Sequence, residues 1–100
     1  MASLTSDAAV TITRNDEARR YEAWLDGTVA GFTAYRTRPD AIVFTHTEVG
    51  AEYEGRGIGS ALAHFALDDA RARGAKIVAQ CPFVAGYVQR HPAYADLVAS

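Results

Sequence analysis

A short glycine-rich stretch constrains the fold of this chain more than any other feature. Gly55, Gly57 and Gly59 alternate with other residues over five positions. Residues 42–45, which precede it, are β-branched or aromatic, as is typical of a strand. Beyond it, apolar residues recur at helical spacing, namely Ile58, Leu62, Phe65, Ala66 and Ala70. The sequence therefore predicts a strand, a tight turn and a helix in direct succession.

A helix that begins directly after a glycine turn can bind an anion. The first amides of a helix have no partner within the helix, and the helix dipole adds partial positive charge there. Glycines let a phosphate approach the backbone closely, while Arg56 can add a cation and Ser60 a hydroxyl. We therefore expect residues 54–60 to bind a diphosphate. The alternative is a turn that only joins a strand to a helix.

Two common phosphate-binding patterns do not fit this stretch. A P-loop needs a lysine directly before Ser60, where the chain has Gly59. The dinucleotide fingerprint needs Gly-x-Gly-x-x-Gly, whereas the glycines here follow the spacing Gly-x-Gly-x-Gly. If the stretch binds a phosphate, it therefore belongs to another class of phosphate-binding turn.

Length and composition exclude several classes of protein. A chain of 100 residues is one small domain, which we expect to span residues 1–100 with a loose start at 1–7. A net charge of −2 does not favour nucleic-acid binding, and no apolar run approaches the ~20 residues of a membrane span. The first residues lack the features of a secretion signal, and one cysteine cannot form an intrachain disulfide. We expect a cytoplasmic protein that binds neither nucleic acid nor membrane, as a monomer or weak dimer.

The remaining pattern predicts an α+β fold. Alternation predicts antiparallel strands at 10–14, 20–25, 29–37 and 41–49, with Asp26-Gly27 as a hairpin turn. A helix at 57–73 leads to a nearly continuous apolar strand at 76–81, which should pair in parallel with the fourth strand. A second helix is expected at 83–90, with Phe83, Val84, Tyr87 and Val88 facing inward, followed by a tail packed through Tyr94, Leu97 and Val98. The result is a mixed sheet with two helices, an αβ sandwich in which the two parallel strands splay apart into a wedge.

Four segments resemble the GNAT N-acetyltransferases. Glu-Gly-Arg-Gly-Ile-Gly at 54–59 is similar to their acetyl-CoA signature, Arg/Gln-x-x-Gly-x-Gly/Ala. With His-Thr-Glu-Val at 46–49, Cys-Pro-Phe-Val at 81–84 and His-Pro-Ala-Tyr at 91–94, the chain resembles the minimal YjdJ-type subgroup. The resemblance implies that acetyl-CoA binds with its pyrophosphate in the glycine turn and its pantetheine arm in the wedge. The expected cofactor-binding residues are Val49, Gly55, Arg56, Gly57, Ile58, Gly59, Ser60 and Tyr87.

The chain departs from larger relatives in two respects. Glu54 stands where they usually have Arg or Gln, and a carboxylate beside a diphosphate is unfavourable unless it points away. The chain also lacks the helices that help to build the acceptor site in larger relatives. An open groove for a protruding amine is the expected result.

Four residues have candidate roles in the chemistry. His46 and Glu48 alternate along the fourth strand, so they should share one face with Ile42 and Phe44 behind them. From this face either side chain can take a proton from an amine. The resemblance implies Cys81 as the active residue, able to carry the acetyl group, and Tyr87 as the proton donor to the leaving thiolate. The structural alternatives are a hydrogen-bonded His46, a solvated Glu48, a buried Cys81 and a packed Tyr87. The histidines lack metal-ligand spacing, so we predict no metal site.

Three functions remain open. The first is an acetyl-CoA-dependent N-acetyltransferase that acts on a protein lysine, a polyamine or a small amine, by direct attack or through acetyl-Cys81. The second is a CoA- or acyl-CoA-binding module without significant catalysis. The third is an interaction protein that binds no such ligand.

Overall fold

Five strands form one sheet in chain order, and the computed structural model describes them within residues 10–99. The predicted loose start at 1–7 lies outside the described residues. The strands are β1 (Thr11–Asn15), β2 (Arg20–Leu25), β3 (Thr28–Arg38), β4 (Ala41–Val49) and β5 (Lys76–Ala79). The helices are η1 (Ala51–Tyr53), α2 (Ile58–Ala72), α3 (Pro82–Arg90) and η2 (Pro92–Leu97), of which η1 and η2 are 3₁₀-helices.

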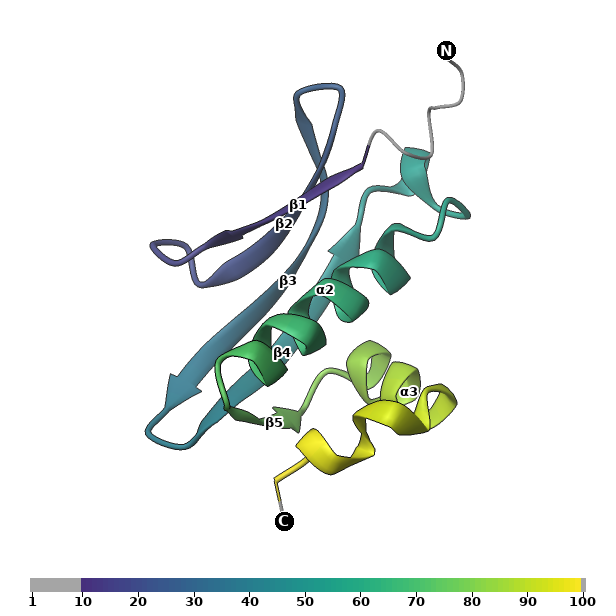
Figure 1. The fold of residues 1–100 in the computed structure, drawn as a ribbon. Helices are drawn as coiled ribbons and strands as arrows, with labels where there is room; N and C mark the ends of the chain where they lie inside the picture. Colours follow the sequence, from purple (N-terminus) through teal and green to yellow (C-terminus); the bar gives the residue numbers. More distant parts are fainter. Residues whose placement is uncertain (1–9, 100) are drawn as a thin grey trace.

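The sheet has the predicted mixed topology. The pairs β1–β2, β2–β3 and β3–β4 are antiparallel, and β4–β5 is parallel. Asp26 and Gly27 both have positive φ, 52° and 78°, as a tight two-residue hairpin turn requires. The α+β expectation is confirmed (Figure 1).

The parallel pair separates after only four residues, because β5 is shorter than predicted. Only Ala41–Phe44 of β4 pair with β5, and the Cys81 amide makes a last hydrogen bond of 2.9 Å to the Phe44 carbonyl oxygen. Pro82 then begins α3. The second half of β4, residues 45–49, therefore has no β5 partner, which gives the gap that the sequence predicted between the two strands.

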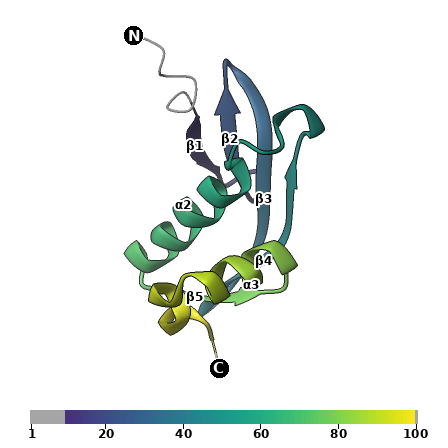
Figure 2. The same cartoon turned by 90° about the vertical axis from the view of Figure 1, so that its right-hand side faces the viewer.

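Both α-helices pack on the same side of the sheet (Figure 2). The core joins Ile42 and Phe44 of β4 to buried side chains of α2, α3 and η2, among them Leu62, Leu67, Val84, Tyr87, Tyr94 and Leu97. Two predictions about inward-facing residues were wrong. Phe83 is 38% exposed because its ring lies against Gly59 at the surface end of α2, and Val98, after the end of η2, is 42% exposed.

A bulge in β4 changes which side chains share a face. Ala34 pairs with His46 but Tyr35 pairs with Phe44, so Thr45 is an extra residue on β4. Ile42 and Phe44 therefore face the helices, whereas His46 and Glu48 lie on the opposite face. The expectation that all four share one face was wrong, because simple alternation cannot anticipate a bulge.

Candidate functional site

The start of α2 has the geometry that the glycine pattern predicted. Gly57, the residue before the helix, has a φ of 76°, which a residue with a Cβ rarely adopts. Its carbonyl oxygen accepts the first helical hydrogen bond, 3.0 Å from the Ala61 amide. The amides of residues 58–60 therefore precede the first bonded turn, and no backbone partner for them is found within residues 10–99.

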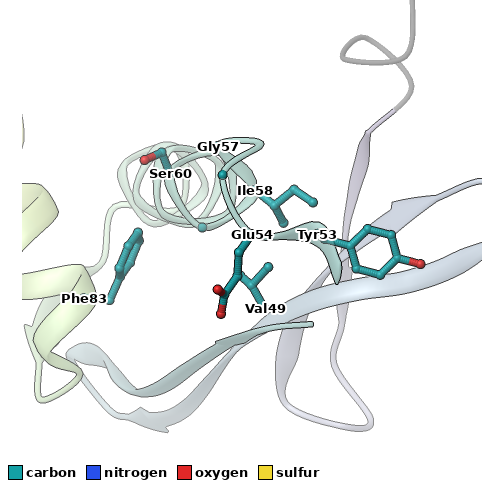
Figure 3. A pocket seen from close by; sticks show the side chains of 9 residues that line it. Val49, Tyr53, Glu54, Gly57, Ile58, Ser60 and Phe83 are labelled. Carbon is teal, nitrogen blue, oxygen red and sulfur yellow. The ribbon is translucent and has the colours of Figure 1, made fainter. Parts of the chain in front are cut away.

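A pocket of about 280 Å³ lies directly in front of these amides. The end of β4, the glycine turn, the first turn of α2 and one side chain of α3 surround it (Figure 3). Its lining residues are Val49, Tyr53, Glu54, Gly55, Gly57, Ile58, Gly59, Ser60 and Phe83. Six of the residues expected to bind cofactor are thus brought together, while Arg56 and Tyr87 do not line the pocket.

Phe83 and Gly59 form one wall of the pocket together. A Cβ built on Gly59 would lie 2.8 Å from the Phe83 ring, which is closer than real side chains approach. The glycine therefore allows the ring of α3 to lie against the first turn of α2. Sequence reasoning assigned Phe83 and Tyr53 no role in the site, because their place at the pocket depends on how α3 and η1 pack.

Glu54, which stands where larger relatives usually have Arg or Gln, lines the pocket. Figure 3 shows its carboxylate directed toward Val49 rather than toward Ser60. Arg56 is exposed and makes no ion pair with any residue that the structure describes. The cation of the turn is therefore available to a ligand, while the nearest carboxylate lies toward the strand side of the pocket.

Cys81 lies at the point where β4 and β5 separate. Its side chain is buried, and its Sγ donates a hydrogen bond of 3.3 Å to Thr47 Oγ1, which is 3.1 Å from Thr33 Oγ1. The thiol does not line the pocket. Sequence reasoning missed both threonines, and only the cross-strand register brings them to the cysteine.

His46 and Glu48 form an exposed pair on the other face of β4. His46 Nε2 lies 3.2 Å from Glu48 Oε1, and both side chains are more than 60% exposed. Thr47, between them in sequence, points to Cys81. Because neighbouring residues of a strand point to opposite faces, His46 and Cys81 lie on different faces of β4 and are not brought together.

Tyr87 is part of the core of α3. Its ring stacks on His91 with 4.0 Å between the ring centroids, and the residue is 5% exposed. Burial, and then the charge of Asp68, raises the pKa of Tyr87 above its usual value. Packing in the core accounts for the position of the Tyr87 side chain, which does not line the pocket.

The part of the chain that the structure describes holds neither a membrane-spanning helix nor a metal cluster. Within residues 10–99, no helix is long and apolar enough to cross a bilayer. Nor do three His, Cys, Asp or Glu side chains come together there in an arrangement that would hold a metal ion.

The fold is similar to solved acetyltransferase structures. A GCN5-like protein from Staphylococcus aureus, known from a solution structure, superposes with a TM-score of 0.71 at 22% identity, over 93% of this chain and 91% of that one. The ribosomal-protein-alanine N-acetyltransferase of Brucella melitensis biovar Abortus 2308 gives a TM-score of 0.59 at 26% identity, over 81% of this chain. This chain spans 61% of the length of that Brucella protein. Among curated protein sequences, none matches the chain.

The sequence also matches a family model. The model describes the GCN5-related N-acetyltransferases, and residues 20–97 match it, a range that runs from the start of β2 to the end of η2. It thus includes the glycine turn and every residue that lines the pocket. The chain therefore belongs to the GCN5-related N-acetyltransferase family.

Proposed function

We propose that this protein is an acetyl-CoA-dependent N-acetyltransferase that transfers an acetyl group to an amine. The observation that carries the proposal is the pocket at the start of α2, which opens beside the half of β4 that β5 leaves unpaired. Family membership supports the same reaction class. The acceptor amine would be a protein lysine, a polyamine or a small amine.

The glycine turn would hold the pyrophosphate of coenzyme A. The amides of Ile58, Gly59 and Ser60 point away from the helix, and the helix dipole favours negative charge there. Arg56 would add a cation from the turn. A Cβ on Gly57 would meet no atom within 4 Å, so the space in front of this residue is open to a phosphate.

The end of β4 would hold the pantetheine arm. The Gly50 amide donates to the Ala30 carbonyl oxygen of β3 at 2.8 Å. Because backbone groups alternate along a strand, those of Val49 then face away from β3, toward the gap. Val49, Tyr53 and Phe83 supply an apolar lining beside them.

Acetyl-CoA, when bound, supplies the acetyl group as a thioester, which is an activated acyl donor. In the direct route the amine nitrogen bonds to the acetyl carbon, the carbon–sulfur bond breaks, and the thiolate takes up a proton. Glu48 or His46 would accept the proton that the amine loses. In the covalent route the Cys81 sulfur would take the acetyl group first with release of the CoA thiol, and the amine would then displace Cys81 from the acetyl carbon. The burial of Cys81 and its bond to Thr47, on the side of β4 away from Glu48, favour the direct route.

A second candidate function is a CoA- or acyl-CoA-binding module without significant catalysis. The carboxylate of Glu54 in the pocket lining and the exposed positions of His46 and Glu48 favour it. It predicts that acetyl-CoA binds but that no amine is acetylated. An assay against a panel of amines and peptides distinguishes the two functions.

Gly57→Asp tests the binding site. The new carboxylate would enter the space in front of the amides, so we expect acetyl-CoA affinity to fall more than tenfold, measured by calorimetry. Gly27→Asp is a matched control, because Gly27 also has a positive φ and open space around its Cβ but lies in the β2–β3 turn. An equal loss in both variants, or no loss in Gly57→Asp, would reject this site. Urea denaturation of both variants measures the stability that each loses through backbone strain, so that a loss of affinity caused by unfolding can be subtracted.

A further inference from the structure

A second pocket lies on the face of the sheet that carries His46 and Glu48. Its volume is about 260 Å³, and its lining residues are Arg20, Val29, Ala30, Gly31, Phe32, Glu48 and Gly50. Glu48 and Gly50 flank Val49, which lines the first pocket. The two pockets therefore meet the same end of β4 from opposite faces of the sheet.

Arg20 is held in place at this second pocket with part of its guanidinium free. Its Nε donates a hydrogen bond of 2.8 Å to Glu22 Oε2, and the side chain of Glu22 is only 7% exposed. The guanidinium lies over the Phe32 ring, 4.7 Å from the centroid. Its two terminal nitrogens have no hydrogen bond to any residue in 10–99. These nitrogens can donate to a ligand without moving the side chain.

Glu48 places the opposite charge at the same pocket. Its backbone pairs directly with Phe32 across the β3–β4 ladder, and Phe32 lies on the strand between that of Glu48 and that of Arg20. His46 also contacts this ring, with 6.0 Å between the ring centroids. The pocket thus has an anion at β4, an apolar middle and a cation at β2.

We propose that this pocket binds the acceptor, and that the acceptor is a small aliphatic amine that also carries a carboxylate. The amine would lie at Glu48, next to the unpaired end of β4, and the carboxylate at Arg20. A planar guanidinium with two free nitrogens is well suited to a carboxylate. The aliphatic chain would lie on Phe32. The inference rests on the proposed acetyl transfer and narrows its acceptor.

Matched amines test the charge requirement. 6-Aminohexanoate and hexylamine have the same chain and amine, but only the first has a carboxylate. We expect kcat/KM to be about tenfold higher for 6-aminohexanoate, because charge-assisted hydrogen bonds to Arg20 add to its binding. Arg20→Gln should raise KM for 6-aminohexanoate to that of hexylamine and leave the KM of hexylamine and acetyl-CoA unchanged.

Three variants control for indirect effects. Arg36→Gln removes the same charge from an exposed site on β3 that lines neither pocket, and it should change nothing. Arg20→Lys should recover only part of the selectivity, because lysine lacks the planar fork. Arg20→Gln leaves the buried carboxylate of Glu22 without its cation and can fold poorly for that reason. The double variant Arg20→Gln/Glu22→Gln removes this carboxylate as well, and it should show the same loss of selectivity.

Binding without acetyl-CoA gives an independent readout. Titration with 6-aminohexanoate should shift the amide NMR signals of Phe32 and Glu48, and Arg20→Gln should abolish the shifts. Equal turnover of both amines, unchanged by Arg20→Gln, would overturn this inference and leave the acetyltransferase intact. Failure of the protein to bind acetyl-CoA would instead overturn the proposed function.

Discussion

At the residue scale, the glycine turn places opposing charges around one small pocket. Free amides, a helix dipole and Arg56 favour an anion, while the carboxylate of Glu54 opposes it. The direction of Glu54 toward Val49 reduces this opposition but leaves one negative charge in the lining. Affinity for a diphosphate should therefore depend on this single side chain.

Replacing Glu54 by Gln tests that dependence. We expect acetyl-CoA to bind about fivefold more tightly at low salt, since removal of one like charge near a phosphate gains roughly 1 kcal/mol. The gain should shrink at high salt, because screening shortens the range of the interaction. Calorimetry at two salt concentrations measures both effects. Glu52→Gln, an exposed residue of η1 outside the pocket lining, is the control, and an equal gain there would contradict the prediction.

Cys81 allows the two chemical routes to be separated. Its thiol donates to Thr47, and the His46–Glu48 pair lies on the other face of β4, so no base from this pair activates it. We expect Cys81→Ser to keep turnover within about threefold, because direct transfer needs no thiol. Mass spectrometry of the wild-type protein with acetyl-CoA alone should find no acetyl group on Cys81. Detection of that adduct, with a large loss of turnover in Cys81→Ser, would establish the covalent route instead.

At the scale of elements, Asp69 ties α2 to the first two strands. Its carboxylate accepts hydrogen bonds from Tyr21 Oη at 2.7 Å, Arg14 Nη1 at 2.7 Å and Arg73 Nη1 at 3.1 Å. Burial by itself would raise the pKa of Asp69, but these three donors outweigh it and hold the pKa below its usual value. This contact fixes the C-terminal half of α2 against β1 and β2, beside the apolar contacts that α2 makes with the core.

The lowered pKa of Asp69 makes stability sensitive to acid. A carboxyl whose folded pKa lies below its unfolded value stabilises the fold above the unfolded pKa of about 4, and this contribution is lost as the pH falls through the folded pKa. Asp69→Asn should therefore cost about 1–2 kcal/mol at pH 7 and less below pH 4. Urea denaturation at pH 7, 5, 4 and 3 measures this. Asp40→Asn, at the exposed β3–β4 turn, should leave the pH dependence unchanged, and the same pH dependence in Asp69→Asn and wild type would refute the assignment.

At the scale of the whole molecule, every element shares one core. A chain of this size buries only about two-thirds of its unfolded surface, so its stability margin is small. The tail belongs to the core through Tyr94 and Leu97, and the Ala99 amide bonds to the Ile77 carbonyl oxygen of β5 at 2.8 Å. The tail thus covers the outer edge of β5, which would otherwise have unpaired backbone groups.

Leu97→Ala tests whether the tail folds with the rest. Because Leu97 is 6% exposed, we expect a loss of about 2–4 kcal/mol and one cooperative urea transition at a lower midpoint. Val98→Ala, at the exposed neighbouring residue, should cost less than about 0.5 kcal/mol. A second transition, or an unchanged midpoint in Leu97→Ala, would mean that the tail unfolds independently of the core.

Local patterns predicted most of the fold. The bounds of β2 and β4 match their predictions, and α2 differs by one residue at each end, because alternation, helical spacing and glycine caps act over a few residues. The parallel pairing of β4 with β5 was predicted from the single helix that joins them. The prediction for β5 was too long, since it extended the strand up to Cys81 whereas β5 ends at Ala79.

Local patterns predicted the candidate site less completely than the fold. The glycine turn and the first residues of α2 were predicted because a ligand site on backbone amides needs only a local conformation. Phe83 and Tyr53 were missed because they reach the pocket through the packing of other elements. The side chains around Cys81 and Arg20 depend likewise on cross-strand register.

The sequence by itself determined the order of the elements, the mixed sheet and the turn that would hold a phosphate. The elements and the turn arise from contacts between near neighbours in the chain, and the parallel pairing follows from the single helix that joins β4 to β5. Only the tertiary structure decided which face of β4 each side chain occupies. The physical reason is the bulge at Thr45, a property of the β3–β4 pair that reverses the alternation beyond it. That reversal separates His46 and Glu48 from Cys81 and sets the two pockets on opposite faces of one strand.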